Sequence, residues 1–287
     1  MSIHPSKYQH PMDQVTLDAL RAIPAFDTIV RKSLKAGPEI AMKARYLGGA
    51  SRITDAQCSR VYKLLPPICD VLGIKEPELY FSGEAEPNAF TFGDENPMVV
   101  VTAGLLDRVS EDELRGIIAH ECGHIACHHV IYHNVAMLLL SGSASLLNLH
   151  GLITTGLLLK MMQWYRASEY SADRAAAVAM KSPSMIQHGL IKIMTGNSEF
   201  VRDVSLDEVI KQADEMDQYL DSFWEKMVTF FSVSGYMSHP FTNFRVRELQ
   251  RWKDSGDFDK VFLNDDGVSI GIEEHKNTKE TLNKIGL

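Results

Sequence analysis

One five-residue segment combines the residue types of a hydrolytic metal site. His120 and His124 are four residues apart, and Glu121 directly follows the first of them. On a helix this spacing puts both imidazoles on one face, one turn apart, where they can bind the same Zn²⁺. Glu121 then lies about 100° round the helix, where its carboxylate can take a proton from a water molecule that zinc activates. Both histidines could also lie on a solvated helix face, so this segment alone leaves two interpretations open.

A second segment offers the ligand that the first one lacks. A catalytic zinc takes three protein ligands and leaves one position open, so a third ligand must come from elsewhere. Glu169 and Asp173 are also one helical turn apart, and one carboxylate can bind the metal while the other accepts the N–H of a ligand histidine. Taken alone, Glu169 is more simply a surface ion-pair residue, but the two segments together favour zinc. Small side chains would let the two helices approach closely: Ala167, Ala172, Ala175 and Ala176.

Three further histidines and two cysteines lie near the first segment. We assign these histidines no second metal. His128 is four residues from His124, but His129 and His133 are equally well explained as residues on a helix surface or facing a partner. Cys122 and Cys127 are five residues apart, which points their side chains to different faces of a helix. We therefore expect both to be small buried apolar residues that form no disulfide with each other.

The helix that presents the first two histidines begins with a clear signal. Ser110 and Glu113 form a capping box, in which a hydroxyl and a carboxylate three residues apart satisfy the first backbone N–H groups. Apolar residues follow, and residues 122–159 include no Asp, Glu, Lys or Arg. A capped helix with apolar flanks favours the metal site over a solvated helix face.

Periodicity and turn residues predict the other helices. They cover residues 12–36, 55–72, 163–180, 184–195, 205–231 and 241–254, with another that ends near residue 49. Asp13 is the expected N-cap of the first helix. Pro66 and Pro67 interrupt the helix over residues 55–72, which closes at Gly73.

Between these helices the sequence changes character. Three short runs of aromatic and β-branched residues, at 79–81, 88–92 and 98–102, are separated by turns that contain glycine and proline. Such runs predict strands, and their succession predicts a small β-meander. The fold class is therefore α+β, mostly helical, with a small sheet.

Composition restricts the partners. The 287 residues suggest one large domain or two small ones, long enough to bury a core without disulfides. The 37 acidic residues outnumber the 29 basic ones, which argues against a nucleic-acid partner because phosphate binding needs a basic face. The first residues form no apolar signal segment, and the four cysteines form no secreted disulfide framework, so a cytoplasmic location is expected.

Several motifs, in order, resemble one family of enzymes. Over residues 55–253 the chain is similar to the zinc metallopeptidases of the HtpX and CAAX-prenyl-endopeptidase family, of the gluzincin type. The matching segments are Asn88-Ala89-Phe90, residues 101–106, residues 113–125, residues 169–173, and His239-Pro240 with Arg245 six residues after the histidine.

The resemblance implies a zincin-like metallopeptidase domain with a small sheet over the active-site helix. It implies one zinc per chain, held by His120, His124 and Glu169, with Glu121 as the general base. Asp173 would orient a ligand histidine and Arg245 would pair with carboxylates near the site. His239 would donate a hydrogen bond to the oxygen that becomes negative during the reaction. Asn88, Ala89 and Phe90 would belong to an exposed edge strand that binds an extended peptide.

The expected function is zinc-dependent cleavage of peptide bonds inside peptides or unfolded proteins. We expect an N-terminal helical segment over residues 1–54 that packs on or covers the cleft, a metallopeptidase domain over 55–256 and a polar tail over 257–287. The alternative is a zinc-stabilised chaperone or adaptor that binds extended peptides on the edge strand without cutting them.

Residues 135–162 are apolar enough to invite a membrane assignment, since Lys160 is their only charge. A single pass needs about 20 apolar residues, which this stretch supplies. The predicted zinc ligands, however, precede and follow it, so a shared zinc requires an even number of crossings and about 40 apolar residues. The stretch is therefore a buried helical hairpin, or a flap that lies on a membrane surface or on a partner. We favour the buried hairpin because no cluster of Lys or Arg flanks the stretch to bind anionic lipid.

This interpretation predicts the behaviour of the protein in fractionated cells. Alkaline carbonate washing should release it from membranes, because no segment spans the bilayer. Its retention in the washed pellet as an integral membrane protein would contradict the hairpin.

Overall fold

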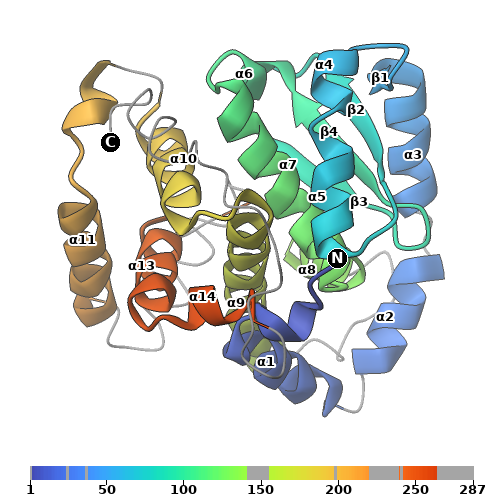
Figure 1. Ribbon diagram of the computed structural model, residues 1–287. Helices are drawn as coiled ribbons and strands as arrows, with labels where there is room; N and C mark the ends of the chain where they lie inside the picture. The colour runs from blue at the N-terminus through green and yellow to red at the C-terminus, as the bar shows by residue number, and fades with distance from the viewer. Residues whose placement is uncertain are drawn as a thin grey trace.

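The computed structural model describes residues 2–23, 26–35, 38–140, 155–196, 199–219, 239 and 242–263. Helix α7 (Glu111–Ala126) lies at the centre, between a four-stranded sheet and the helices α9 (Thr155–Met180) and α10 (Pro183–Thr195) (Figure 1). The predicted class, a mostly helical α+β fold with a small sheet beside the active-site helix, is confirmed.

The remaining described helices are short or of medium length. They are α1 (Pro11–Arg21), α2 (Phe26–Lys35), α3 (Pro38–Gly49), α4 (Ser59–Tyr62), α5 (Leu65–Leu72), α6 (Ala103–Leu106), α8 (Val130–Leu140), α11 (Leu206–Tyr219), α13 (Thr242–Asp254) and α14 (Asp257–Lys260), with 3₁₀ turns at Pro5–Lys7 and Glu199–Asp203.

The order of the strands differs from the prediction. The sheet comprises β1 (Ser51–Ile53), β2 (Glu78–Ser82), β3 (Ala89–Phe92) and β4 (Met98–Thr102), in the order β1-β2-β4-β3. β2 and β4 are parallel, whereas β3 is antiparallel to β4, so the predicted meander is wrong. The reason is burial: β4 is buried at every residue, as suits a central strand, while β3 has partly exposed residues and lies at an edge. β1 was not predicted.

A close backbone crossing lets β3 reach the far side of β4. The loop after β2 passes over the end of β4 at Gly104, whose N–H donates to the Glu84 carbonyl at 3.0 Å. A Cβ at Gly104 would lie 1.9 Å from the carbonyl oxygen of Ala85, so only glycine fits here. Thr102 closes the crossing by donating its N–H to the Asn88 carbonyl at 3.0 Å. As a result, the edge strand β3 packs beside α7.

Two local signals in the sequence correspond to the structure. The capping box is confirmed: the Ser110 N–H donates to Glu113 Oε2 at 2.6 Å, and the Glu113 N–H donates to Ser110 Oγ at 3.3 Å. Gly73 ends α5 in the left-handed conformation, with φ +68°. Pro66 and Pro67 lie in the first turn of α5, so the interruption comes just before them.

The first predicted helix is two helices in the structure. α1 and α2 replace the helix expected over residues 12–36, and the sequence has Pro24 between them, a residue that disfavours helix just before it. Asp13 is not the N-cap, which was a wrong prediction. His10 caps α1, its Nδ1 accepting the Met12 N–H at 3.2 Å, while Asp13 is completely buried.

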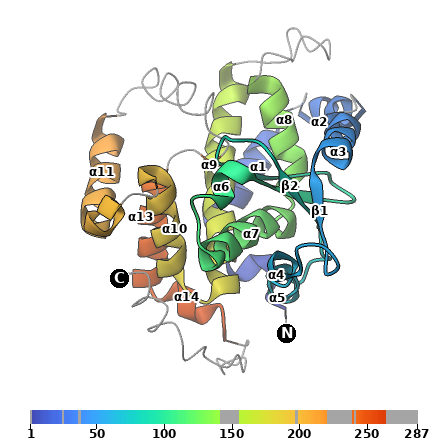
Figure 2. The same cartoon turned by 90° about the horizontal axis from the view of Figure 1, so that it is seen from above.

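The N-terminal helices share an apolar cluster with both described ends of the 135–162 stretch. α2 lies beside α8, and α1 packs along α9 (Figure 2). The buried members of the cluster include Leu20, Phe26, Val135, Leu157 and Trp164. The predicted hairpin also includes residues 141–154, which lie outside the described residues. Within the described part of the chain, no helix is both long and apolar enough to cross a membrane.

The later helices extend or shorten the predicted ones. α9 begins at Thr155, before the predicted start at residue 163. α11 is described as far as Tyr219, and residues 220–231 of the predicted helix lie outside the described residues. Phe258 and Val261 are buried in the main core, so the packed structure continues past residue 256.

The close packing of α7 on α9 depends on small residues, as predicted. Ala172, Ala175 and Ala176 are fully buried, and Gly123 of α7 lies against the first two of them. A Cβ at Gly123 would lie 2.8 Å from Ala175 Cβ and 3.0 Å from Ala172 Cα, and the second contact is with backbone that cannot turn away. The two helices can therefore approach this closely only with glycine at this position.

This contact predicts an inverted effect of Gly→Ala substitution. In an open helix position the change favours the helix by about 1 kcal/mol, but overpacking costs about 1–3 kcal/mol. Gly123→Ala should therefore lower the free energy of unfolding, measured by urea denaturation. The matched control is Gly189→Ala in α10, where a Cβ meets no atom within 4 Å and stability should not fall. Equal stabilisation by both substitutions would show that the α7–α9 contact is not tight.

Candidate metal centre and active site

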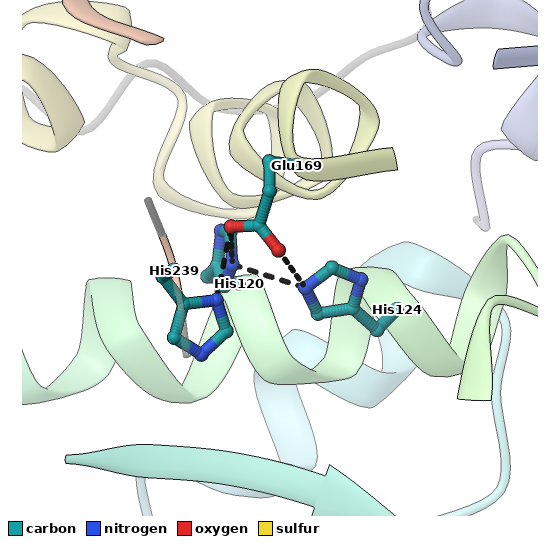
Figure 3. A group of neighbouring side chains, drawn as sticks. All are labelled: His120, His124, Glu169 and His239. Carbon is teal, nitrogen blue, oxygen red and sulfur yellow. Dashed lines mark hydrogen bonds and ion pairs between the residues drawn. The ribbon is translucent and has the colours of Figure 1, made fainter. Parts of the chain in front are cut away.

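His120 and His124 lie on one face of α7, as their four-residue spacing requires (Figure 3). Their Nε2 atoms are 3.1 Å apart, and both side chains are buried. Glu169 reaches them from α9, with Oε2 3.4 Å from Nε2 of His120 and Oε1 3.5 Å from Nε2 of His124. His239, which precedes α13, completes the group: one ligand atom from each of the four residues lies within 4.8 Å of the others.

This cluster fits a metal ion. Glu169 is 1% exposed, and its Oε1 has no hydrogen-bond partner within the described part of the chain. A buried carboxylate oxygen without a partner is costly, and a cation in contact with it would remove that cost. Two imidazole nitrogens and one carboxylate oxygen are a ligand set of catalytic zinc sites.

Asp173 and Arg245 form hydrogen bonds and ion pairs with His120 and Glu169 on the side away from the metal position. Asp173 Oδ1 lies 2.9 Å from Nδ1 of His120, so the Nδ1–H donates to the carboxylate and Nε2 faces the metal position. Arg245 donates to Asp173 through Nε at 2.7 Å and Nη2 at 2.6 Å, and its Nη1 lies 3.3 Å from Glu169 Oε2. Burial raises the pKa of Asp173, but Arg245 and His120 outweigh burial and the pKa is below its ordinary value. The carboxylate is therefore ionised.

Glu121 lies beside the metal position and under the edge strand. Thr91 Oγ1 of β3 donates to its Oε2 at 2.7 Å, and Nε2 of His239 lies 3.3 Å from its Oε1. Burial raises the pKa of Glu121, but the nearby imidazoles, His239 first, lower it to about 2. The carboxylate is thus ionised and able to accept a proton. Sequence reasoning missed Thr91, whose only signal is a hydroxyl in an otherwise apolar strand.

His239 connects the metal position to the edge strand. Its Nδ1–H donates to Glu169 Oε2 at 2.9 Å, and its Nε2–H donates to the Ala89 carbonyl at 3.0 Å. Burial lowers the pKa of His239, but Glu169 and then Glu121 raise it well above the ordinary value. The imidazolium therefore lies between two carboxylates, next to the backbone of β3.

The residues predicted to bind substrate have different surroundings. Ala89 has its carbonyl beside the site, on the edge strand. Asn88 precedes the strand and accepts from the Thr102 N–H. The ring of Phe90 packs against Tyr46, 5.6 Å between ring centres, and so belongs to the cluster under α3. The structure thus brings Ala89 to the site, while the Phe90 side chain packs elsewhere.

A mostly apolar cavity adjoins the site between β3 and α10. One end is formed by Ala89, His120, Glu121 and His239. Its apolar wall includes Ile117, Met180, Ile186, Leu190 and Ile193. A chain bound along β3 would therefore have an apolar side-chain site next to the metal position.

His129 is the site residue that sequence reasoning misplaced. It is 1% exposed, with Nδ1 3.0 Å from Nδ1 of His124 and Nε2 2.7 Å from Asp13 Oδ2. The surface interpretation is wrong because α7 ends at Ala126 and the chain reverses at His128, where φ is +57°. The reversal turns His129 back, so that its N–H donates to the His124 carbonyl at 2.9 Å.

The neighbouring histidines divide between surface and interior. His128 is exposed. His133 is partly buried: its Nε2 lies 2.8 Å from Ser168 Oγ and its ring stacks on Tyr165, so the surface interpretation is wrong for it as well. The sequence did contain a signal for the burial of His129 and His133, since residues 122–159 include no charged residue. A histidine in such a stretch lies in apolar surroundings and needs a polar partner.

The fold and the site together define the class of protein, which is a zincin-like metallopeptidase. Residues 56–253 match Peptidase family M48, and the chain belongs to this family. The predicted resemblance and the predicted enzyme class are thereby confirmed. Zinc is the metal of M48 peptidases, and the cluster of His120, His124, Glu169 and His239 fits it.

Two relatives illustrate the similarity. The chain is 26% identical over 280 residues to the plastoglobule-localized metallopeptidase 48, chloroplastic, of Arabidopsis thaliana, covering 97% of this chain and 78% of that protein. It is 27% identical over 226 residues to a protease HtpX homolog of Sulfurovum sp., covering 71% of this chain and 79% of that protein. No solved structure was found to match the chain.

The geometry predicts which residues hold the metal. Purified protein should contain about one zinc per chain, and His120→Ala or His124→Ala should lose it, because each removes one of three ligands. His239→Ala should keep its zinc, and so should the control His128→Ala, which removes an exposed imidazole. Metal analysis after desalting measures this. Loss of zinc from His239→Ala would make His239 a ligand instead of a donor to substrate.

Proposed function

We propose that this protein is a zinc endopeptidase that cuts extended segments of peptides or unfolded proteins. The position of Glu121 carries the proposal. It is a buried, ionised carboxylate beside the metal position, and the hydroxyl of Thr91 holds it against the edge strand. A site that only stabilised the fold would have no use for such a carboxylate there.

In this proposal His120, His124 and Glu169 hold one zinc per chain. When bound, zinc lowers the pKa of water and polarises the peptide carbonyl. Glu121 takes the proton of the attacking water and passes it to the leaving amine. Asp173 and Arg245 keep His120 and Glu169 in position.

His239 would act on the carbonyl oxygen of the substrate. Its Nε2–H now donates to the Ala89 carbonyl, which lies on the free side of the edge strand. An extended peptide that adds to β3 would offer its own N–H to Ala89. That exchange would release the Nε2–H of His239, which could then donate to the oxygen that becomes negative.

The substrate region combines backbone and side-chain recognition. Asn88, Ala89 and Phe90 would supply the backbone edge, and the apolar cavity beside α10 would take a side chain of the substrate. Backbone pairing is independent of sequence, so any preference would come from the cavity.

The alternative, a zinc-stabilised chaperone or adaptor, has less support. Structural zinc takes four protein ligands, which would require His239 as the fourth. Membership of a peptidase family also favours an enzyme. A cytoplasmic location, the exclusion of nucleic acid and a peripheral contact through residues 135–162 stay predictions.

The proposal predicts a separation of metal binding from cleavage. Glu121→Gln should keep zinc, because the ligands remain, but cleavage of an unfolded protein should fall at least 10²-fold, because the base is gone. Chelation should also abolish cleavage by wild-type protein. The control is Glu111→Gln, at the partly exposed start of the same helix, where the carboxylate pairs with Arg60; this variant should cleave normally. Full activity of Glu121→Gln would contradict the mechanism.

A further inference from the structure

A buried chain of hydrogen bonds runs from the N-terminal helix to the metal position. Asp13 Oδ2 lies 2.7 Å from Nε2 of His129, and Nδ1 of His129 lies 3.0 Å from Nδ1 of His124. The three side chains are 0%, 1% and 2% exposed, in that order. We propose that Asp13 is a positioning residue for His124, acting through His129, so that helix α1 is part of the metal site. The inference rests on the proposed function, because it takes His124 as a zinc ligand.

The partners of Asp13 set the direction of the hydrogen bonds. Trp164 Nε1 donates to Oδ1 at 3.1 Å, and Gln9 Nε2 and Ser171 Oγ donate to Oδ2 at 2.9 and 2.6 Å. A carboxylate that receives this many donors is an acceptor only. Burial raises the pKa of Asp13, but His129 and the other donors lower it to about 2, in agreement with this. The proton between Asp13 and His129 is therefore on Nε2 of His129.

That proton decides which nitrogen of His124 is free. In this proposal His129 has a single N–H, on Nε2, so its Nδ1 is an acceptor and Nδ1 of His124 must be the donor. Nε2 of His124 is then left with a lone pair, and it is this atom that faces Glu169 and His120. A histidine that ligates a metal is neutral, so its one proton is then on Nδ1. The chain thus holds His124 in the tautomer that binds a metal through Nε2.

The two histidines of α7 are held in parallel ways. Nδ1 of His120 donates directly to the carboxylate of Asp173, and Nδ1 of His124 donates to His129, which donates to the carboxylate of Asp13. A carboxylate behind a ligand histidine fixes its orientation, and its removal typically weakens metal binding 10- to 100-fold. The path from His124 is longer because the chain reversal at His128 places the His129 imidazole behind His124. The Asp173 carboxylate of α9 has the corresponding position behind His120.

The test measures zinc affinity, by competition with a chromophoric chelator, in folded protein. Asp13→Asn keeps the shape but puts an N–H where Trp164 or His129 already points a donor, so affinity should fall about 10-fold or more. His129→Leu removes the acceptor of His124, and its zinc affinity should fall as far. In His129→Gln the amide oxygen can accept this hydrogen bond, so part of the lost affinity should be recovered. The double variant Asp13→Asn/His129→Leu should be no weaker than His129→Leu alone, because Asp13 acts only through His129.

A matched control separates positioning from stability. Thr16→Val also removes a buried polar group from α1. The Thr16 hydroxyl donates to the backbone carbonyls of Met12 at 2.6 Å and Asp13 at 3.2 Å, but it contacts none of the three side chains of the hydrogen-bond chain. Its zinc affinity should be unchanged even where its melting temperature falls. Unchanged affinity in folded Asp13→Asn and His129→Leu, or additive losses in the double variant, would overturn the proposal.

A measurement on wild-type protein avoids variants that fail to fold. Imidazole ¹⁵N–¹H correlation spectra of the zinc-loaded protein should show the proton of His124 on Nδ1 and that of His129 on Nε2. The opposite tautomer at His129 would refute the chain. The outcomes also separate the two proposals. If His124→Ala keeps its zinc, the assignment of His124 as a ligand fails. If His124→Ala loses its zinc but the zinc affinity of Asp13→Asn is unchanged, only the role of Asp13 is refuted.

Discussion

The close approach of α7 and α9 is the constraint on which the site depends. Gly123, between the two histidines of α7, lies against the backbone of Ala172, between Glu169 and Asp173 of α9. A larger residue at either position would push the helices apart and lengthen the distances between the atoms that one ion must bridge. The smallest side chains are therefore placed next to the ligands, and the packing that holds the helices together also sets the distances between ligand atoms.

Charge balance is the second constraint, because all of these groups are buried. Glu121, Glu169 and Asp173 are ionised, and Arg245 is the guanidinium that contacts two of them. Three carboxylates and one guanidinium leave two negative charges, and buried charge must be compensated. A dication brings the sum to zero when His239 is neutral, whereas without the dication the negative charge favours the His239 imidazolium. The same excess of negative charge explains why the pKa of His239, which lies between two of the carboxylates, is raised.

Much of the site could be predicted because helical geometry converts spacing into position. Two pairs of residues one turn apart, on helices marked by a capping box and by alanines, were enough to bring His120, His124, Glu169 and Asp173 together. The link between Asp13 and His129 could not be predicted in this way, since 116 residues separate them and neither spacing nor composition encodes such a contact. The strand order was missed for a related reason. It depends on the crossing at Gly104, a tertiary contact, although the uninterrupted run Val99-Val100-Val101 already suited a central strand.

In the proposed mechanism the metal ligands stay fixed while His239 responds to substrate, and the structure holds these residues in different ways. His120, His124 and Glu169 lie on helices, and each histidine has a hydrogen-bonded partner behind its ring, which lowers the cost of arranging ligands around a metal. His239 lies in no helix or strand, and in the proposed mechanism an incoming peptide competes for its bond to the Ala89 carbonyl. A donor held by exchangeable bonds can turn to a new acceptor at little cost, whereas a ligand held in this way would lose the metal. The difference in support between these residues is therefore what a hydrolytic site requires: rigid metal ligands, and a polar group whose hydrogen bond is redirected when the substrate binds.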